Sequence, residues 1–391
     1  MISVSEAKNI LVKNIPTLSV EYLKVSDSLG RVISKDLTSP IDVPSFNNSS
    51  MDGYAFCFED KKTQYKIVGS IQAGDTNSLT INAGESARIF TGAPIPKGAD
   101  TVIQQELVTI NNDEISIDNN EIQIGSNIRL RGSQCKKGDI VIKSGTLVTV
   151  GVVALLSSVG ITKIPVYRQP RVKVIITGNE LIEPGTPLCD GKIYNANQSS
   201  ILSYLKLLGI ENTEFIHVKD NLDELRSQVS VALNNCDVLI LSGGISVGEY
   251  DFVYKALIEE SVQPLFYKVK QKPGKPMFVG KKDDKLIFAL PGNPAAVITC
   301  FNQYVKPSLR MMLGESNAFN NYVLLPLAKD WKKNGVLSNI LKAEVKNGEV
   351  TILHGEDSFN LLPFVDTNTF VLLYENDMEK KKGELVELYY W

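Results

Sequence analysis

Residues 237–251 read DVLILSGGISVGEYD, and this stretch decides the fold. Residues 238–241 form a continuous apolar run, which is typical of a strand buried on both faces. Gly243 and Gly244 then allow a sharp turn and let a ligand come close to the backbone N–H groups. Helical spacing begins at Phe252. A strand, a glycine turn and a helix N-terminus together predict an anion-binding site.

Polar residues continue beyond the two glycines. They are Ser246, Gly248, Glu249 and Asp251. Two carboxylates at the rim of an anion site suggest a metal ion between the protein and a phosphate. Asp251 also stands where a helix N-cap would, so a purely structural role competes with metal binding there.

Composition limits the classes of protein that this chain can be. Its 391 residues suggest several domains, and 43% apolar with 22% charged content is ordinary for a globular protein. The net charge of −3 excludes a global basic field for nucleic acid, and no apolar run approaches a membrane span. The N-terminal stretch lacks the apolar core of a signal peptide, and the five cysteines are scattered. We therefore expect a cytoplasmic protein with reduced thiols.

From residue 171 strands and helices alternate, which predicts a doubly wound, mostly parallel sheet. The expected strands are residues 171–177, 213–218, 237–242, 265–269 and 285–290. Ligands of such sheets bind at the C-terminal ends of the strands. Three loops fall there, namely residues 177–180 (TGNE), the glycine turn, and residues 290–294 (LPGNP).

Residues 268–276, KVKQKPGKP, add four lysines beside these loops. A lysine run is usually a solvated face. Here prolines and a glycine stiffen the segment and orient the ammonium groups, so the sequence favours an oxyanion receptor.

The flanking regions read as β structure. Residues 65–121 alternate short strands with Gly, Asn and Asp turns, and residues 321–391 do the same. The loop of residues 42–55 gathers polar side chains around Asp52, although Asp52-Gly53 alone is also a plain turn signal. Thr91 in FTGAPIPKGAD could present a hydroxyl to an anion, but a structural loop fits its spacing equally well.

These segments together resemble a known family. SGGISVGEYD, QKPGKPM and LPGNPAA look like the molybdopterin-binding fold, and SSMDGYA, IFTGAPIPKGAD and TGNEL narrow the resemblance to the molybdopterin molybdenumtransferases, the MoeA family, which are relatives of the gephyrin C-terminal domain. The resemblance covers essentially the whole chain. It implies an α/β plus β fold, an elongated multi-domain subunit with a molybdopterin-binding sheet domain. The implied domains are a discontinuous first domain (1–40 and 137–168), an inserted β domain (41–136), the α/β domain (169–316) and a C-terminal β domain (317–391).

The resemblance also implies a reaction. Adenylylated molybdopterin and molybdate are the implied substrates, Mg²⁺ the cofactor, and AMP a product. The residues expected to act in catalysis are Asp52, Glu180, Asp220 and Asp251, with Glu180 and Asp251 on the metal. Those expected to bind substrate are Thr91, Gly243, Gly244, Ser246, Gly248, Glu249, Lys268, Lys272, Lys275, Pro276, Pro291, Gly292, Asn293 and Ser358. Lys272 and Lys275 with Ser358 are the expected molybdate contacts.

The implied assembly is a homodimer that works with other molybdenum-cofactor biosynthesis proteins. Gln134, Asn179 and Ala296 depart from the family pattern, and residues 337–341 contain no counterpart of the arginine that helps to bind molybdate. A molybdopterin adenylyltransferase and a non-catalytic molybdopterin-binding scaffold therefore remain the alternatives. The sequence does not separate molybdate from tungstate as substrate.

Overall fold

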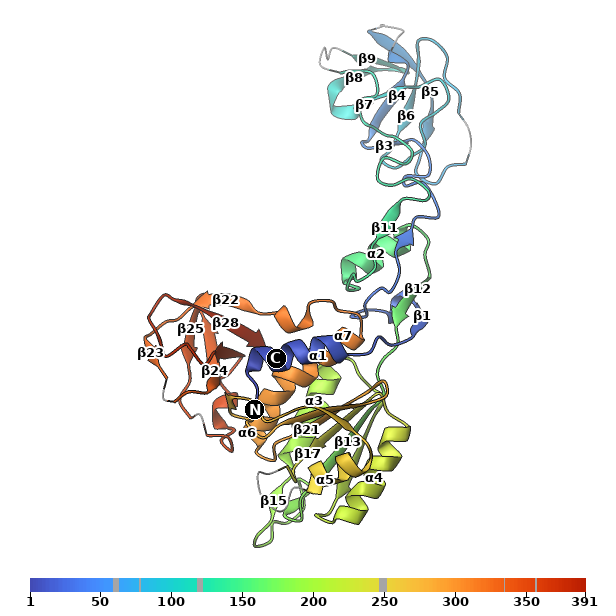
Figure 1. The fold of residues 1–391 in the computed structure, drawn as a ribbon. Coiled ribbons are helices and arrows are strands. Elements are labelled where there is room, and N and C mark those ends of the chain that lie inside the picture. The colour runs from blue at the N-terminus through green and yellow to red at the C-terminus, as the bar shows by residue number, and fades with distance from the viewer. Residues whose placement is uncertain (59–62, 77–78, 118–121, 246–251, 334, 356) are drawn as a thin grey trace. The chain divides into compact units, whose positions relative to one another are not determined.

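The computed structural model covers residues 1–391 and describes all of them except 59–62, 77–78, 118–121, 246–251, 334 and 356. The chain divides into two compact units (Figure 1). The larger unit comprises Met1–Tyr22, Gly30–Ser34 and Pro165–Trp391, and the smaller unit Leu23–Leu29 and Lys35–Ile164. The chain passes between the units four times, within β1 (Val20–Lys24), after Leu29, after Ser34 and within β12 (Lys163–Tyr167).

The larger unit is built on a six-stranded sheet in the order β16-β13-β17-β21-β20-β18. Its strands are β13 (Val172–Thr177), β16 (Thr213–Val218), β17 (Val238–Ser242), β18 (Gln263–Tyr267), β20 (Phe278–Lys282) and β21 (Lys285–Leu290). The first four strands in this order are parallel. At one edge β20 pairs antiparallel with β21, and β18 pairs antiparallel with β20. The predicted doubly wound, mostly parallel sheet is therefore confirmed.

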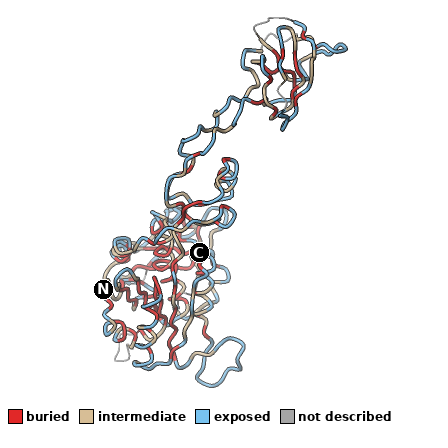
Figure 2. Tube along the Cα trace, turned by 90° about the vertical axis from the view of Figure 1, so that its right-hand side faces the viewer, coloured by how far each residue is buried: buried red, intermediate tan, exposed pale blue. Residues whose placement is uncertain are grey.

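Helices cover both faces of this sheet (Figure 1). They are α3 (Ala196–Leu207), α4 (Leu222–Asn234), α5 (Phe252–Glu259), α6 (Pro294–Cys300) and α7 (Lys306–Met312), with the π-helix η4 (Phe301–Val305) joining the last two. Alternate residues of β17 pack into the two hydrophobic cores, one on each face of the sheet. Val238 and Ile240 pack with α3, whereas Leu239 and Leu241 pack with α4 and α5. The continuous apolar run is the consequence of burial on both faces, which Figure 2 shows along the strands.

The order of the parallel strands determines where the sheet has its topological switch point. β13 comes first in the chain but lies between β16 and β17. The connection from β13 leads through α3 to β16, whereas the connection from β17 leads through α5 to β18 at the opposite edge, so the two leave in opposite directions. Such a switch point leaves a crevice at the carboxyl ends of the two central strands.

A second sheet follows in the larger unit. It contains β19 (Gln271–Lys272), β22 (Val323–Pro326), β24 (Ser338–Lys346), β26 (Thr369–Leu373) and β28 (Leu385–Tyr390), with β25 (Glu349–Ile352) paired to β24. β19 joins it in parallel, with Lys272 opposite Asn339. Short pieces complete the unit: β14 (Leu181–Ile182), β15 (Ile193–Tyr194), η5 (Ala318–Asn320), β23 (Trp331–Lys332), η6 (Leu362–Phe364) and β27 (Glu379–Lys380).

The smaller unit holds a six-stranded sheet in the order β7-β4-β6-β5-β9-β8. Its strands are β4 (Gly53–Phe56), β5 (Gln64–Ile71), β6 (Glu85–Ile89), β7 (Thr101–Gln104), β8 (Val108–Asn111) and β9 (Glu114–Ile117). Shorter elements are η1 (Val25–Asp27), β2 (Leu37–Thr38), β3 (Asn48–Ser49), η3 (Gln105–Leu107), β10 (Ile128–Arg129), β11 (Ile140–Ile142) and α2 (Val150–Ser158). Among the described residues, no helix has the length and apolar content needed to cross a membrane.

The first helix, α1 (Val4–Asn14), buries a lysine in the core of the larger unit. Ser3 and Glu6 form the predicted capping box, and Val4, Ala7 and Leu11 pack into the core. Lys8 is only 8% exposed, and its Nζ lies 4.1 Å from the centroid of the Tyr389 ring. In the described part of the chain this Nζ has no hydrogen-bond partner. Burial lowers the pKa of Lys8 to about 8, although the charge of Glu387 opposes the shift.

We expect Lys8→Met to stabilise the fold, because methionine keeps the apolar stem and removes a buried charge. The gain in unfolding free energy at pH 7 should be about 1–3 kcal/mol. Since the pKa of Lys8 is lowered on folding, the unfolded chain binds more protons between about pH 8 and pH 10, and stability attributable to Lys8 rises with pH in that window. Urea unfolding from pH 7 to pH 10 should show a steeper rise of stability with pH in the wild type than in the variant. A less stable variant at pH 7 would mean that the contacts with Tyr389 and Glu387 outweigh burial.

Candidate active site

A cleft of about 940 Å³ lies at the carboxyl ends of β13 and β17 in the larger unit. The turns after β13, β17 and β21 form its walls, and residues near the C-terminal sheet close one side. Its lining includes Thr177–Leu181 from the first turn, then Ile193, Tyr194, Ala196, Asn197, Asp220, Gly243, Gly244, Ile245, Phe252, Gly292, Asn293, Pro294, Phe359 and Leu361. The three loops that the sequence placed at the strand ends therefore meet at the switch point.

The glycine turn after β17 requires both of its glycines. Gly243 and Gly244 have φ values of +91° and +61°. A Cβ on Gly243 would lie 2.3 Å from the carbonyl oxygen of Thr177, and one on Gly244 would lie 2.8 Å from the Thr177 hydroxyl. Without side chains, the turn packs directly against the end of β13, which leaves its backbone facing the cleft.

Asn197 at the start of α3 ties the turns together. Its Nδ2 donates to the hydroxyl of Ser242 (3.1 Å) and to the carbonyl oxygen of Gly292 (2.8 Å). Its Oδ1 is buried and has no hydrogen-bond partner among the described residues. Asn197 was not among the predicted site residues, because a lone asparagine at a helix start looks like a cap.

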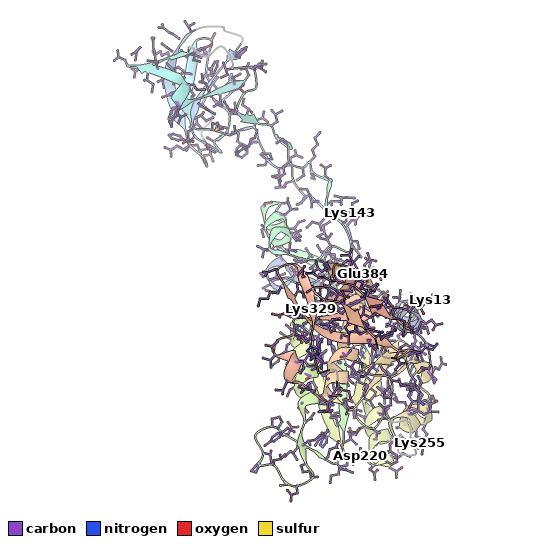
Figure 3. The ribbon with its side chains drawn as sticks, turned by 90° about the vertical axis from the view of Figure 1, so that its left-hand side faces the viewer. Lys13, Lys143, Asp220, Lys255, Lys329 and Glu384 are labelled. Carbon is purple, nitrogen blue, oxygen red and sulfur yellow. The ribbon has the colours of Figure 1, made fainter. Side chains whose placement is uncertain are left out.

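Two carboxylates stand in the cleft on neighbouring loops. Glu180 follows β13 and Asp220 follows β16, and both are exposed. Asp220 accepts a hydrogen bond from the Asn179 N–H, while the Asn179 side-chain oxygen accepts one from the Asp220 N–H, each at 3.2 Å. Asn179, one of the departures from the family pattern, therefore fixes the loop that carries Asp220, which Figure 3 marks at the edge of the sheet domain.

The turn after β21 contacts a loop from the C-terminal β region. Asn293 Nδ2 donates to the Ser358 hydroxyl at 2.6 Å, and the Ala295 N–H donates to the Ser358 carbonyl oxygen at 3.1 Å. Pro291 lies just before this turn, and its carbonyl oxygen accepts a hydrogen bond from Ser242. Ser358 is thus beside the cleft, although it is not one of the residues in the described lining.

The lysine-rich segment lies next to the cleft rather than within its described lining. Lys272 lines a small separate cavity with Ala295 and Thr299. The buried Gln271 anchors the segment, because its Nε2 donates to the Gly274 carbonyl oxygen and its Oε1 accepts a hydrogen bond from the Tyr304 hydroxyl. The other predicted contacts of this segment, Lys268, Lys275 and Pro276, are absent from the described lining of the cleft.

The predicted residues of the smaller unit form a cluster of their own. Asp52 Oδ1 accepts hydrogen bonds from the backbone N–H and the hydroxyl of Thr91, both at 2.7 Å. These bonds hold the pKa of Asp52 below its ordinary value. Arg88 lies nearby, with its guanidinium 4.7 Å from the Phe90 ring and a hydrogen bond to the Gly53 carbonyl oxygen. The carboxylate is therefore ionised, oriented and exposed.

Four predicted site residues lie outside the described residues. They are Ser246, Gly248, Glu249 and Asp251. Their roles remain predictions.

Comparisons with known proteins now bear on this geometry. Residues 2–160 match the MoeA N-terminal region (domain I and II), and residues 173–311 match a probable molybdopterin binding domain. Curated molybdopterin molybdenumtransferases from Haemophilus influenzae and Staphylococcus epidermidis are each 33% identical over 99% of this chain, covering 98% and 95% of their own lengths. This chain belongs to the molybdopterin molybdenumtransferase family.

Solved structures agree with this membership. Two structures of a molybdopterin biosynthesis MoeA protein from Pyrococcus horikoshii match with a TM-score of 0.84, at 31% and 27% identity. They cover 100% of this chain, which covers 99% and 100% of theirs. The stretch that matches the molybdopterin-binding domain contains all three turns of the cleft.

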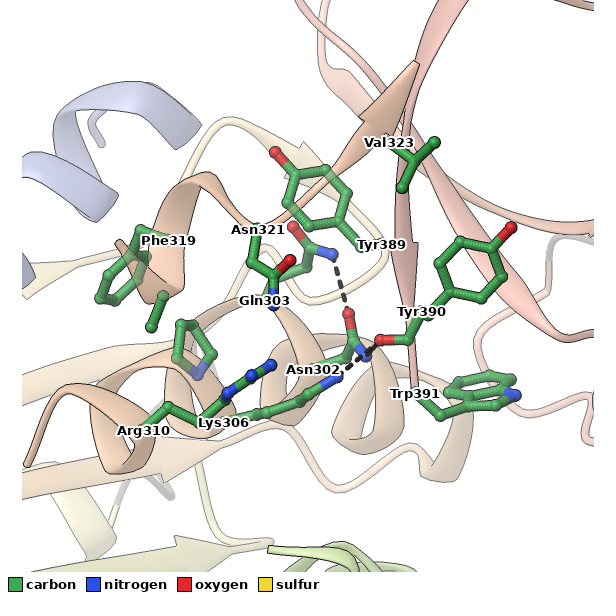
Figure 4. Close-up of a pocket in the computed structure, with 12 residues that line it drawn as sticks. Asn302, Gln303, Lys306, Arg310, Phe319, Asn321, Val323, Tyr389, Tyr390 and Trp391 are labelled. Carbon is green, nitrogen blue, oxygen red and sulfur yellow. Dashed lines mark hydrogen bonds between the residues drawn. The ribbon is translucent and has the colours of Figure 1, made fainter. Parts of the chain in front are cut away.

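A second cavity of about 110 Å³ has a structural explanation (Figure 4). Lys306 Nζ and Asn302 Nδ2 both donate to the Tyr390 carbonyl oxygen, at 2.6 and 3.0 Å. These bonds anchor the end of β28 to the helices of the α/β domain. Burial lowers the pKa of Lys306 to about 8. Within the described residues, this cavity and the cleft at the ends of β13 and β17 have no lining residue in common.

Proposed function

We propose that this protein inserts molybdenum from molybdate into adenylylated molybdopterin and releases AMP, with the cleft at the ends of β13, β17 and β21 as its site. It is a transferase of molybdenum-cofactor biosynthesis, as its curated relatives are named. The observation that carries the finer proposal is the convergence of an open glycine turn with two carboxylates in one cleft.

The glycine turn suits the phosphates of the substrate. Backbone N–H groups that face a cleft bind phosphate oxygens without adding bulk, and the close approach of Gly243 and Gly244 to Thr177 keeps that backbone in place. Asn197 holds the turns after β17 and β21 at a fixed separation. In the proposed step the adenylyl bond breaks, water completes the AMP phosphate, and the phosphate of molybdopterin keeps the bridging oxygen.

The carboxylates suit a magnesium ion that is held mainly by phosphate oxygens. Mg²⁺ typically takes one or two protein carboxylates and completes its shell with phosphates and water. Among the described residues, no group of three or more His, Cys, Asp or Glu side chains forms a metal site. Glu180 would hold the ion, with Asp220 in the same cleft and Asp251 outside the described residues. The ion supplies charge stabilisation at the phosphates.

Molybdate, a tetrahedral dianion, is proposed to bind beside the turn after β21. Lys272, Lys275 and Ser358 are the proposed contacts, because ammonium and hydroxyl donors match oxyanion acceptors. The contact between Ser358 and Asn293 joins this proposed molybdate site to the cleft. Asp52 and Thr91 of the smaller unit are proposed to assist turnover.

We further propose a cytoplasmic homodimer that receives its substrate from other proteins of the same biosynthesis. Static light scattering should then give about twice the chain mass of 43.1 kDa. A mass of one chain, with full activity, would contradict the dimer.

A turnover assay tests the reaction. Purified protein, adenylylated molybdopterin and Mg²⁺ should release AMP only when molybdate is added, and parallel reactions with tungstate show which oxyanion is preferred. Formation of adenylylated molybdopterin from ATP, without molybdate-dependent AMP release, would instead identify an adenylyltransferase. Binding without either reaction would identify a scaffold.

A further inference from the structure

Lys342 is a buried lysine on β24, in the C-terminal sheet. Only 6% of the surface of Lys342 is exposed. The ammonium group donates to the carbonyl oxygens of Gly355 (2.6 Å) and Asn360 (3.3 Å), and lies 5.0 Å from the centroid of the Phe364 ring. Lysine is rarely buried in this way without a specific role for its charge.

The two carbonyls belong to opposite ends of one loop. We call residues 355–361 the Ser358 loop; residue 356 lies outside the described residues. Because one ammonium group contacts both ends, it fixes the distance between them. The Leu353 N–H also donates to the Lys342 carbonyl oxygen at 2.9 Å, so the chain entering the loop is held to the same residue.

The Ser358 loop reaches the cleft on its other side. Ser358 contacts Asn293 and Ala295 through the two hydrogen bonds described above. Phe359 and Leu361 line the cleft itself, and Phe359 is 70% exposed. Lys342 also lines the small cavity that contains Lys272, and Asp357 of the loop belongs to the same lining.

We propose that Lys342 is a positioning residue, which holds the Ser358 loop against the turn after β21 and so places Ser358 and Phe359 at the cleft. The expected effect on molybdate kinetics rests on the proposed function, whereas the expected effect on the Ser358 loop does not. Lys342 acts through Ser358, so its loss weakens the capture of molybdate more than it slows the step that follows.

The test compares Lys342→Met with Lys342→Arg. Methionine keeps the stem and removes the ammonium group, whereas arginine can still donate to both carbonyls. Lys346→Met is the matched control, because Lys346 lies on the same strand and is exposed. Hydrogen exchange over residues 355–361 should be faster in Lys342→Met, and near the wild-type rate in Lys342→Arg and in the control.

Kinetics provide the second measurement. In Lys342→Met the KM for molybdate should rise about tenfold, while kcat stays within about threefold of the wild type. Ser358→Ala should raise the same KM. The double variant should raise the KM for molybdate no further than the more affected single variant, because both substitutions disrupt the same contact between Ser358 and molybdate. If Lys342→Met does not fold, Lys342→Gln replaces it with the same expected direction.

The outcomes separate the two proposals. Faster exchange with an unchanged molybdate KM, or additive effects of the two substitutions, would overturn the positioning role. Unchanged exchange would overturn it as well. A wild-type protein without molybdate-dependent AMP release would overturn the proposed function, while the exchange measurement would still decide whether Lys342 holds the loop.

Discussion

Glu180→Gln should leave the protein folded and slow molybdate-dependent AMP release by about 10- to 100-fold, which is the largest catalytic effect that we expect. Charge-assisted contacts contribute about 1.5–3 kcal/mol each, and glutamine brings no negative charge to a cation. Glu180 is exposed in the cleft, so its replacement should not disturb the core. Raising the Mg²⁺ concentration should recover part of the lost rate, because the weakened ligand lowers ion occupancy.

Asp220→Asn distinguishes charge from loop structure. Asparagine can still accept the hydrogen bond that the Asn179 N–H gives to Asp220, so the loop should keep its conformation. A loss of turnover in this variant therefore reports the missing charge. Glu183→Gln is the matched control, since Glu183 is an exposed carboxylate that is not part of the described cleft lining. Wild-type turnover in both Glu180→Gln and Asp220→Asn would remove these carboxylates from the reaction.

Asp237→Asn should reduce the free energy of unfolding of the larger unit by about 2–4 kcal/mol. Asp237 precedes β17, and its side chain is only 10% exposed. It accepts two hydrogen bonds from Arg168, at 2.7 and 2.8 Å, and one from the Arg171 N–H at 2.7 Å. Asparagine loses the charge that both arginines face, so one end of the central strand is released from the chain that leads into β13.

The pH dependence of this loss has a definite sign. Burial alone would raise the pKa of Asp237, but the hydrogen bonds from Arg168 and Arg171 outweigh it and hold the pKa well below its ordinary range. The stability due to Asp237 is therefore complete above about pH 4, the unfolded pKa, and declines as the pH falls below that value. The difference between wild type and Asp237→Asn should shrink over the same range.

Glu214→Gln is the control for this measurement. Glu214 pairs with Lys173 on neighbouring strands, and its side chain is 56% exposed. A surface pair of this kind contributes about 0–1 kcal/mol, so urea unfolding should barely change. An Asp237→Asn variant as stable as this control at pH 7 would show that the arginines are adequately solvated without the carboxylate.

The sheet and its glycine turn could be predicted from the sequence, because each of the patterns that indicate them has a single physical explanation. The apolar run of β17 could only be a strand covered on both faces, and Gly243 and Gly244 could only serve a close turn. The alternation of strands and helices then fixed the sheet and the edge where ligands bind. β20 was missed because a glycine interrupts its short apolar run.

The rest of the site depends on contacts between residues that are distant in the chain. Asn197 and Lys342 are single polar residues inside ordinary elements. Only the folded chain shows that Asn197 joins two turns and that Lys342 joins the two ends of one loop. The lysine segment shows the reverse. Its composition predicted an oxyanion site, but its position beside Ala295 and β24 follows from the pairing of β19. A strand of two residues leaves no pattern in the sequence from which this pairing could be predicted.

A crystal structure with AMP, molybdate and Mg²⁺ tests the central claim most directly. Anomalous scattering from molybdenum locates the oxyanion independently of the nucleotide. We expect the phosphate of AMP in the cleft, within hydrogen-bond distance of N–H groups of the glycine turn at Gly243 and Gly244, with the molybdenum peak beside Ser358 and Lys272. An ordered nucleotide elsewhere on the protein, with the cleft empty, would contradict the account.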